Sequence, residues 1–411
     1  MKPSLRLERC RIDKRRLNFR SSLLRMAMKR LLRWILITSP LVLITAVWGI
    51  DTLRQNELAG KRAFEAQPDS AFEAMLEKPP IVLDGQILHP KVQYNLQARA
   101  GQDMSARREG LRQVLLNGGL KRSMLRKHID EDWNYRTDSG APMQSIHEVK
   151  IPGLDGNTLD ARVYVPKVAN ETEDLPVLLY FHGGGFIFAS IEAMHGAVQL
   201  MANEARVVVV SVNYRLAPEY TYPAANRDAM AAWAWARKHV GEFGGNAERI
   251  AVGGDSAGAY LSVATSLALR ERGEALPAAQ LLYYPVVDTA AEKYPSWRLF
   301  GEDFGLDKYF IRVALELYVP DPNQRDDLRL SPIRENDLSG MPPAIIVSAG
   351  FDPLRDQARD YARKLEEDGV AATYINAASL HHGFLESSGT INDAGRIARQ
   401  SATLLGMQLR R

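Results

Sequence analysis

Arg249-Ile-Ala-Val-Gly-Gly-Asp-Ser-Ala-Gly258 is the stretch of sequence that decides the fold. Its first half is a short apolar run that is typical of a buried strand, and a longer apolar segment typical of a helix begins at Ala257. Ser256 lies between them, where the chain must turn sharply, and glycines two residues to either side let the strand and the helix approach closely. The stretch therefore predicts a strand, a tight turn that presents the Ser256 hydroxyl, and a helix. By itself the pattern also fits a glycine-rich turn with an ordinary serine.

The sequence on both sides of this turn alternates between short apolar strands and longer helices. Residues 207 to 210 are four valines, apolar on both faces, as in a strand covered by helices on both sides. This alternation predicts an α/β fold with a mostly parallel central sheet, whose ligands bind beyond the carboxyl ends of the strands. The predicted strands are Thr158–Val165, Val177–Phe181, Arg206–Asn213, Arg249–Gly253, Ala279–Tyr284, Ala344–Ala349 and Ala371–Asn376. The predicted helices are Pro90–Arg99, Ser105–His128, Ala224–Val240, Ala257–Arg272 and Arg355–Asp368.

A second motif, His182-Gly183-Gly184-Gly185-Phe186, directly follows one of the predicted strands. Three glycines leave their backbone N–H groups unobstructed, so these groups can converge on an oxygen that becomes negative in a transition state. His182 is better suited to orienting this loop than to acting as a base. We therefore expect an oxyanion-binding loop, and the alternative is a flexible loop without that role.

The histidines that follow Ser256 are candidates for a general base. A serine hydroxyl becomes a nucleophile when an imidazole takes its proton and a carboxylate orients that imidazole. Only His381 and His382 follow Ser256 in the sequence, beyond the last predicted strand, where a loop can bring a base over the sheet. Because the two are adjacent, they could exchange roles.

Three aspartates are candidates for the orienting carboxylate. Asp352 follows the strand Ala344–Ala349 after two residues, so it should lie at that strand's carboxyl end. Asp356 is four residues further on, within a predicted helix, and Asp288 follows a different strand. Asp352 is the preferred candidate, with the other two as alternatives.

Taken in order, these motifs resemble the motif set of the hormone-sensitive-lipase-like esterases, a branch of the α/β-hydrolases. The resemblance covers roughly residues 145 to 400 and includes Tyr214-Arg-Leu-Ala-Pro-Glu219, Asp352-Pro353-Leu354 and His382-Gly383-Phe384. It implies that Ser256 is the nucleophile, Asp352 the orienting acid and His382 the base. It also implies an oxyanion hole made by the N–H groups of Gly183, Gly184 and Ala257, and a structural role for Glu219.

The resemblance implies a serine carboxylesterase that hydrolyses short- to medium-chain carboxylic esters through an acyl-enzyme, with a small-molecule ester as substrate and no metal or organic cofactor. A lipase, a lactonase or a deacetylase acting on an envelope or lipid substrate would share these motifs. A non-catalytic ligand-binding relative is a further alternative, but such proteins typically lose a catalytic residue. The sequence leaves the physiological substrate, the stereoselectivity and the oligomeric state open.

Composition excludes several other classes of protein. The 411 residues are 46% hydrophobic and 25% charged, as expected of a chain with a large core. The single cysteine is Cys10, so disulfides and cysteine-based metal sites are excluded from the rest of the chain. Residues 1–33 carry a net charge of +10 while the whole chain carries +3, so the part from Asp51 onward is acidic. Such a part gives no electrostatic reason to expect nucleic acid as a partner.

The N-terminal region indicates contact with a membrane. Residues 34–50 are uncharged, with Trp34 and Trp48 near the two ends, and they follow the basic leader at 1–33. We expect a single-pass anchor with the basic side in the cytoplasm and the catalytic part on the periplasmic or extracellular side. Secretion after signal cleavage and an interfacial or buried helix are the alternatives.

The remaining chain divides into a helical spacer and cap at 51–144 and a catalytic domain at 145–411. Within that domain, the apolar stretches Tyr294–Phe310 and Ile311–Val319 fit either an acyl pocket or part of the core.

Overall fold

The computed structural model describes residues 56–99, 104–168 and 174–411. The chain divides into two units after Ala63, and the second unit, Phe64–Arg411, contains the sheet and the site. The predicted basic leader and uncharged segment, residues 1–33 and 34–50, lie outside the described residues. Within the described ranges, no helix combines the length and the apolar character needed to cross a membrane.

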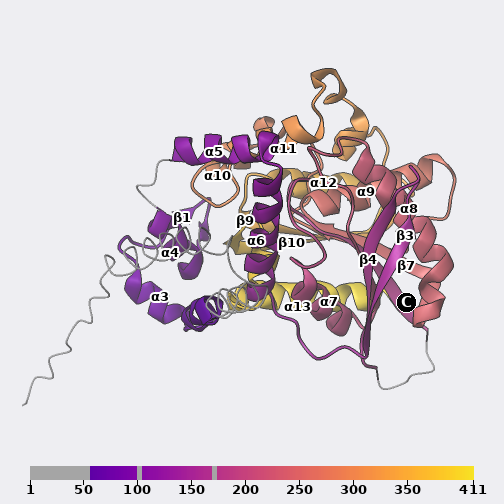
Figure 1. Cartoon of the computed structure of the whole chain (residues 1–411), viewed down its shortest axis with the longest axis horizontal. Coiled ribbons are helices and arrows are strands. Elements are labelled where there is room, and N and C mark those ends of the chain that lie inside the picture. Colours follow the sequence, from indigo (N-terminus) through magenta and orange to yellow (C-terminus); the bar gives the residue numbers. More distant parts are fainter. Residues whose placement is uncertain (1–55, 100–103, 169–173) are drawn as a thin grey trace, which may run out of the picture. The chain divides into compact units, whose positions relative to one another are not determined.

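The described residues of the second unit form an eight-stranded sheet in the order β10-β9-β8-β7-β5-β6-β4-β3 (Figure 1). Strands β5 to β10 run parallel to one another, whereas β4 pairs antiparallel with β6, and β3 pairs antiparallel with β4 at the edge. The prediction of a mostly parallel sheet is therefore confirmed. The strands are β3 (Ser145–Pro152), β4 (Thr158–Val165), β5 (Leu175–Phe181), β6 (Val208–Val212), β7 (Gly245–Asp255), β8 (Gln280–Tyr283), β9 (Ala344–Phe351) and β10 (Ala372–His381).

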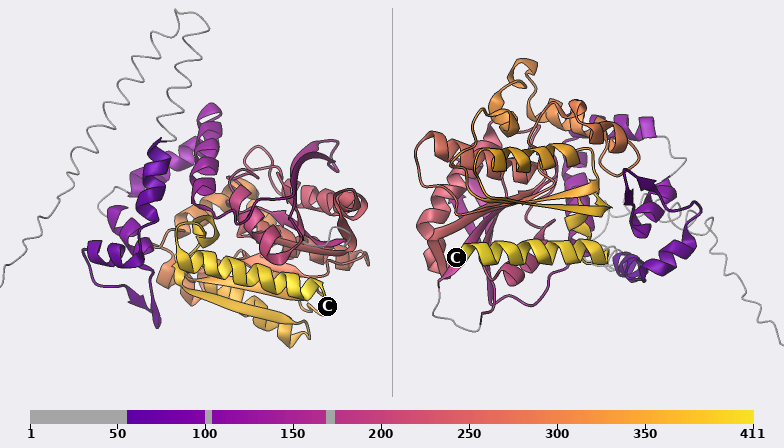
Figure 2. Two further views of the ribbon diagram at one scale, coloured as in Figure 1. Left: turned by 90° about the horizontal axis from the view of Figure 1, so that it is seen from below. Right: turned by 180° about the vertical axis from the view of Figure 1, so that it is seen from behind.

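Helices cover both faces of the sheet, which explains why its central strands are apolar throughout. Every residue of β5 and β6 is buried. Side chains of α7 and α13 share a hydrophobic cluster with one face, and those of α8, α9 and α12 share clusters with the other. Figure 2 shows α12 and α13 on opposite sides of the sheet. These helices are α7 (His195–Ala205), α8 (Ala224–His239), α9 (Ala257–Glu271), α12 (Arg355–Glu367) and α13 (Asn392–Leu409).

The segment before the sheet is helical, and we call four of its helices the N-terminal helices: α3 (Asp69–Met75), α4 (Pro90–Arg99), α5 (Met104–Asn117) and α6 (Leu120–Arg136). The prediction of one helix over Ser105–His128 is wrong, because α5 and α6 are separate. Gly119 between them has a φ of +40°, in the left-handed range that favours glycine, and the backbone turns there.

Strand β3 was not among the predicted strands. It pairs antiparallel with β4 at the edge of the sheet, and most of its side chains are at least partly exposed. Its sequence therefore lacks the continuous apolar run that marks β5 and β6.

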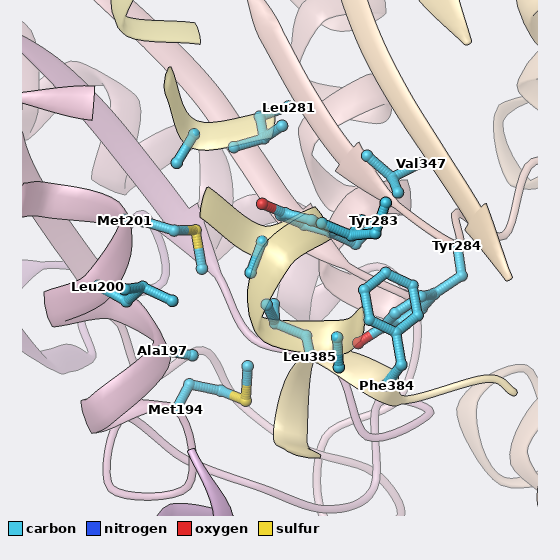
Figure 3. Close-up of a cluster of buried hydrophobic side chains, with 14 of the residues drawn as sticks. Met194, Ala197, Leu200, Met201, Leu281, Tyr283, Tyr284, Val347, Phe384 and Leu385 are labelled. Atoms are coloured by element: carbon cyan, nitrogen blue, oxygen red, sulfur yellow. The ribbon is translucent and has the colours of Figure 1, made fainter. Parts of the chain in front are cut away.

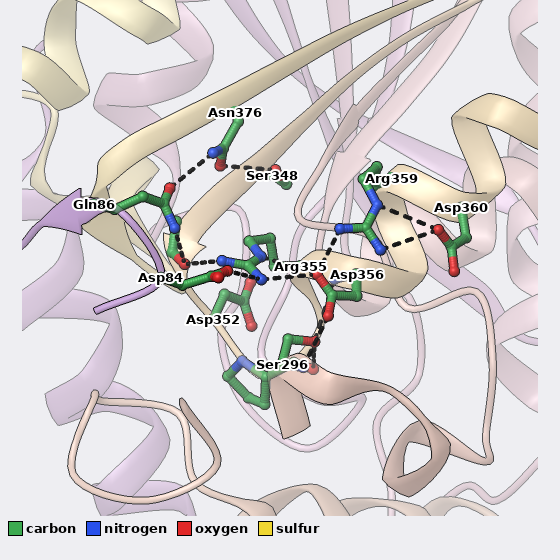
Figure 4. A network of polar contacts seen from close by, with 12 residues as sticks. Asp84, Gln86, Ser296, Ser348, Asp352, Arg355, Asp356, Arg359, Asp360 and Asn376 are labelled. Carbon is green, nitrogen blue, oxygen red and sulfur yellow. Dashed lines mark hydrogen bonds and ion pairs between the residues drawn. The ribbon is translucent and has the colours of Figure 1, made fainter. Parts of the chain in front are cut away.

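A small hairpin of β1 (Val82–Leu83) and β2 (Gln86–Ile87) fastens this segment to the carboxyl ends of β9 and β10 (Figure 4). Asp84 at its turn forms an ion pair with Arg355 at 2.7 Å. Gln86 donates to the Gly350 carbonyl at 3.3 Å and accepts from Asn376 at 2.8 Å. The hairpin is therefore tied to the edge of the sheet at which the predicted site lies.

Candidate active site

Ser256 lies at the turn between β7 and α9, as the sequence predicts. Its φ of +53° is unusual for a residue with a side chain, and its N–H donates to the Tyr283 carbonyl at 2.9 Å. A Cβ atom on Gly258 would lie 1.9 Å from the carbonyl oxygen of Phe181. Glycine is required at this position because α9 and the end of β5 are in backbone contact.

His382 connects Ser256 to a buried carboxylate. Its Nε2 lies 3.0 Å from Ser256 Oγ, and its Nδ1 lies 2.8 Å from Asp352 Oδ2. Asp352 has no exposed surface, and its other oxygen accepts from the Leu354 N–H at 2.8 Å. The structure thus brings together the serine, histidine and aspartate that the sequence put forward. The carboxylate orients the imidazole with Nε2 toward the hydroxyl, which is the arrangement needed to accept its proton.

The two alternative carboxylates are engaged elsewhere. Asp356 forms an ion pair with Arg355 at 2.9 Å (Figure 4). Asp288 forms ion pairs with Lys293 at 2.5 Å and Arg334 at 2.7 Å. Among the hydrogen bonds of the described residues, neither is bonded to a histidine, so Asp352 is the one of the three that orients the imidazole.

The alternative histidine is engaged with the backbone of its neighbour. His381 Nδ1 lies 2.5 Å from the carbonyl oxygen of His382, and its ring lies beside Gly305. Its side chain lines the same cavity as His382, but the imidazole hydrogen-bonded to Ser256 Oγ is that of His382.

Aromatic packing holds the loop that carries His382. Phe384 and Leu385, in a short 3₁₀ helix over Phe384–Ser387, are buried in the hydrophobic cluster shown in Figure 3. The Phe384 ring packs edge-on against Tyr284 with centroids 5.2 Å apart, and the Tyr284 ring lies 4.6 Å from that of His382. This packing fixes the imidazole position, since the loop cannot shift without uncovering aromatic surface.

The first glycine of the triple-glycine motif does not have a free N–H. Gly183 donates to Asp255 Oδ1 at 2.8 Å, and the Tyr180 hydroxyl donates to the same oxygen at 2.6 Å. Burial raises the pKa of Asp255 to about 6. The prediction that Gly183 belongs to the oxyanion hole is therefore wrong, because its donor is committed to the residue that precedes the nucleophile.

The next two glycines keep their donors available. Among the described residues, no acceptor receives a hydrogen bond from the N–H of Gly184, Gly185 or Ala257. Gly184 has a φ of +101°, which a residue with a side chain rarely adopts, and a Cβ there would lie 2.4 Å from the Phe188 carbonyl oxygen. The loop thus presents the adjacent N–H groups of Gly184 and Gly185 as donors, near the N–H group of Ala257 at the start of α9.

His182 supports this loop and is not in contact with Ser256. Its Nδ1 lies 2.8 Å from the Gly183 carbonyl, and its ring stacks on Tyr214 with centroids 4.3 Å apart. Complete burial lowers the pKa of His182 to about 4, so the ring is neutral near pH 7 and donates from Nδ1. This agrees with the expectation that His182 orients the loop.

An arginine of the N-terminal helices also holds the loop, and no feature of the sequence pointed to it. Arg126 in α6 donates to the Ile187 carbonyl at 2.8 Å and to the Ala217 carbonyl at 2.7 Å. Its remaining donors bind the carboxylate of Glu219, which also pairs with Arg122. Glu219 therefore has the structural role expected of it, through a partner about ninety residues away in the sequence.

Two cavities meet at Ser256. The first, which we call the apolar pocket, has a volume of about 80 Å³ and is lined mainly by Phe186, Tyr260, Phe310, Ala314, Leu315 and Tyr318. The second, which we call the polar cavity, has a volume of about 450 Å³ and extends along His382, Glu386 and the N-terminal helices. Helix α11 (Lys308–Tyr318) lines the apolar pocket, whereas Trp297 and Phe300 of α10 (Pro295–Phe300) are buried in the core. The sequence left open whether this apolar region forms an acyl pocket or part of the core. Helix α11 forms pocket wall, and α10 contributes to the core.

The fold and this site define a serine hydrolase of the α/β type, and comparison with known proteins agrees. A family model described as alpha/beta hydrolase fold matches residues 178–386. The chain belongs to this family, within its hormone-sensitive-lipase-like branch.

Named relatives and solved structures are similar over most of the described chain. A carboxylic ester hydrolase of Mycobacterium tuberculosis, LipN, is 40% identical over 58% of this chain and 64% of its own length. The ethyl acetate hydrolase of Pseudomonas putida is 32% identical over 68% of this chain and 88% of its own length. The crystal structure of a thermostable carboxylesterase from a metagenomic library is 36% identical, covers 71% of this chain and 98% of its own, and has a TM-score of 0.66.

Proposed function

We propose that this protein is a serine carboxylesterase that hydrolyses esters of short- to medium-chain acids through an acyl-enzyme. The observation that carries the proposal is the hydrogen-bonded series from Asp352 through His382 to Ser256, located where two cavities meet. The names of the relatives support ester hydrolysis as the reaction.

The mechanism follows from this geometry. His382 Nε2 takes the proton of Ser256 as Oγ attacks the ester carbonyl, and Asp352 stabilises the imidazolium. The N–H groups of Gly184, Gly185 and Ala257 donate to the carbonyl oxygen as it becomes negative. His382 then gives its proton to the leaving alcohol, and afterwards activates the water that releases the acid.

The position of His382 indicates which part of the ester each cavity holds. The leaving alcohol must lie next to the imidazole that protonates it, and the polar cavity, unlike the apolar pocket, is lined by His382. The alcohol portion therefore occupies the polar cavity and the acyl chain occupies the apolar pocket. A volume of about 80 Å³ supports a short acyl chain.

The N-terminal helices complete the alcohol side of the site. Residues of α4, α5 and α6 line the polar cavity, and Arg126 of α6 binds the loop that carries Gly184. We assign these helices the role of a cap, which excludes water from the reacting ester and contributes to substrate specificity.

We also propose that residues 34–50 anchor the protein in a membrane, with the catalytic unit on the non-cytoplasmic side. The basic residues at 1–33 and the absence of charge at 34–50 support this orientation. In sealed inverted membrane vesicles the catalytic unit should resist added protease. Digestion without detergent would contradict the orientation, and release of the enzyme by salt alone would contradict the anchor.

Replacement of the nucleophile tests the enzymatic proposal. Ser256→Ala should lower hydrolysis of a nitrophenyl ester by at least about 10³-fold while leaving the thermal unfolding temperature within a few degrees of wild type. A fluorophosphonate probe should label wild-type protein and not the variant. Near-normal turnover by Ser256→Ala would exclude the mechanism, and failure of both hydrolysis and labelling in the wild type would favour a ligand-binding protein.

A further inference from the structure

The wall of the polar cavity carries more acidic than basic side chains. Its carboxyl groups belong to Glu65, Asp132, Asp255, Asp307 and Glu386, and its permanent cations are Lys91 and Arg136. The wall also contains apolar residues such as Phe72 and Leu96, but an apolar alcohol that covered its carboxyl groups would take water from them without offering a partner.

Both cations of this wall already have partners. Lys91 Nζ donates to the carbonyl oxygens of Glu65 at 2.8 Å and Thr390 at 2.7 Å, and is buried. Arg136 forms an ion pair with Asp132 at 2.6 Å. The Lys91 contacts tie α4 to the chain before α3 and to the segment after η6 (Phe384–Ser387), and the Arg136 contact lies within α6, so the fold explains both cations without a ligand.

Two of the acidic groups are also explained by the fold. Asp307 accepts from the Phe310 N–H at 2.7 Å as the N-cap of α11, and pairs with Arg108 at 3.1 Å. Asp255 holds the Gly183 loop through the hydrogen bond of 2.8 Å. Neither needs a substrate to complete its hydrogen bonds.

Of the two that remain, Glu65 lies in the helix before α3, where its buried Oε2 also has no hydrogen-bond partner among the described residues, whereas Glu386 lies on the turn that carries the base. In the described part of the chain no group donates a hydrogen bond to the Glu386 carboxyl, and no cation lies within ion-pair distance of it. A Cβ atom on Gly383 would lie 3.0 Å from Glu386 Oε1, so the carboxyl group lies against the glycine that follows the base. The Glu386 N–H donates to the Gly383 carbonyl at 3.2 Å, which fixes the residue on the same turn as His382. Both side chains line the polar cavity.

We propose that Glu386 binds a hydroxyl group on the alcohol portion of the substrate, so that the preferred substrates are short acyl esters of diols and polyols. The proposal rests on the proposed function, because it takes His382 as the acid that protonates the leaving alcohol. It places a small apolar acyl group in the apolar pocket, which has a volume of about 80 Å³, and a larger polar alcohol in the polar cavity, which has a volume of about 450 Å³.

The direction of the Glu386 pKa shift favours a hydroxyl over a cation as its partner. Burial raises the pKa of its carboxyl well above the ordinary value; Arg136 opposes the rise, and the carboxyl groups of Asp255 and Asp132 add to it. A protonated carboxyl offers one O–H donor and one carbonyl acceptor, and a hydroxyl group can pair with both. An ammonium group would pair with the acceptor only.

Two acetate esters of equal size test the proposal. The 2-hydroxyethyl and propyl esters share the acyl group and differ in a terminal hydroxyl against a methyl, so the ratio of their kcat/KM values reports on the alcohol side alone. We expect Glu386→Leu to lower the ratio of hydroxyethyl to propyl ester by about tenfold, as loss of one buried hydrogen bond predicts. Glu386→Gln, which keeps a neutral donor and acceptor, should keep the ratio within about threefold of wild type.

Because a ratio is compared within each variant, a general loss of activity does not affect it. An unchanged ratio in Glu386→Leu would overturn the proposal while leaving the esterase function intact. The proposal would be overturned in favour of cation binding if the wild type preferred the 2-(trimethylammonio)ethyl ester to both others. In that case kcat/KM for this ester should fall equally in Glu386→Leu and Glu386→Gln. A wild type that hydrolyses none of the esters would instead contradict the proposed function.

Discussion

Gly183 donates its backbone N–H to Asp255 Oδ1 at 2.8 Å, and this bond links the triple-glycine loop to the residue before the nucleophile. The same oxygen accepts from the Tyr180 hydroxyl, within strand β5. The aspartate is almost fully buried, so two donors from one side of the sheet fix its position beside Ser256. The spacing between nucleophile and oxyanion donors is therefore set by a hydrogen bond between their supporting residues.

Adding a methyl group to Gly183 should disturb this spacing. The new Cβ would lie 2.2 Å from Asp255 Oδ2, a distance that forces the loop or the carboxylate to move. We expect Gly183→Ala to lower kcat by about 10²-fold, the effect of losing one oxyanion donor. Gly241→Ala is the matched control, because a Cβ there meets no atom within 4 Å. Equal activity of the two variants in a nitrophenyl acetate assay would show that the loop tolerates the shift.

Arg126 should influence catalysis through the same loop, although it contacts no reacting atom. Its guanidinium binds the Ile187 and Ala217 carbonyls, and the Ile187 N–H in turn donates to Gly184 at 3.1 Å. Removing the side chain in Arg126→Ala should let the N–H groups of Gly184 and Gly185 move out of position. We expect kcat to fall about 10- to 100-fold with a much smaller change in KM, because transition-state contacts are weakened more than ground-state binding.

A neighbouring arginine provides the control for Arg126. Arg122 pairs with the same Glu219 but donates its other hydrogen bond to Leu115, within the N-terminal helices. Arg122→Ala should keep kcat within about threefold of wild type. Added guanidinium ion at low concentration should restore part of the activity of Arg126→Ala only. An equal fall in kcat in the two variants would show that catalysis depends on the ion pairs with Glu219 and not on the contacts of Arg126 with the loop.

Paired substitution of the adjacent histidines tests the choice of base. His382→Ala should lose about 10³-fold or more in kcat, because its Nε2 is the imidazole nitrogen that lies 3.0 Å from Ser256 Oγ. His381→Ala should retain turnover within about tenfold, since its Nδ1 is directed at the His382 carbonyl. Activity measured with 4-nitrophenyl acetate distinguishes the two, and an active His382→Ala beside an inactive His381→Ala would reverse the assignment.

Local sequence was sufficient for the parts of the fold and site that depend on chain order and apolar runs. The central strands are buried on both faces, so their sequences are continuously apolar and easily located. Ser256, Asp352 and His382 each follow a strand, and parallel strands bring such residues to one edge of the sheet.

What the sequence could not supply depends on contacts between distant segments. The Gly183 prediction was wrong because the partner of its N–H is a side chain 72 residues away. Arg126 could not be distinguished among the many arginines of the N-terminal helices, since its role comes from carbonyl groups of two other loops. The edge strand β3 was missed because a half-exposed strand carries no continuous apolar signal.

Narrowing the apolar pocket should shorten the preferred acyl chain. Ala314 lies on the face of α11 that lines this pocket, 3.4 Å from where a Cβ on Gly185 would be. Ala314→Leu adds three carbon atoms to a volume of about 80 Å³. We expect kcat/KM for nitrophenyl butyrate to fall at least about tenfold relative to acetate, as overfilling of an apolar pocket predicts. A panel from acetate to octanoate measures this, and an unchanged profile would mean that the acyl chain occupies the polar cavity.

Asp130 should make the folded protein less stable as the pH rises from about 4 to about 6. Its Oδ2 accepts from the Ser190 hydroxyl at 2.8 Å, while its buried Oδ1 has no donor among the described residues. Burial therefore raises the pKa of Asp130 to about 6, above the ordinary 3.8. The protonated form is favoured in the folded state, so its contribution is complete below about pH 4 and is lost as the pH passes 6.

Asp130→Asn keeps an acceptor for Ser190 and cannot ionise. The variant should therefore not lose stability through this residue as the pH rises. Denaturant unfolding at pH 4, 5, 6 and 7 should show the variant gaining stability relative to wild type as the pH rises, by the order of 1 kcal/mol at pH 7. Part of the wild-type slope should remain, because burial also raises the pKa of Asp255 to about 6 and that residue is present in both proteins. Asp326→Asn is the control, since Asp326 is exposed and its replacement should leave the slope unchanged. Parallel curves for wild type and Asp130→Asn would mean that Asp130 ionises as easily in the folded chain as in the unfolded one, so its single hydrogen bond and its surroundings would offset the cost of burial.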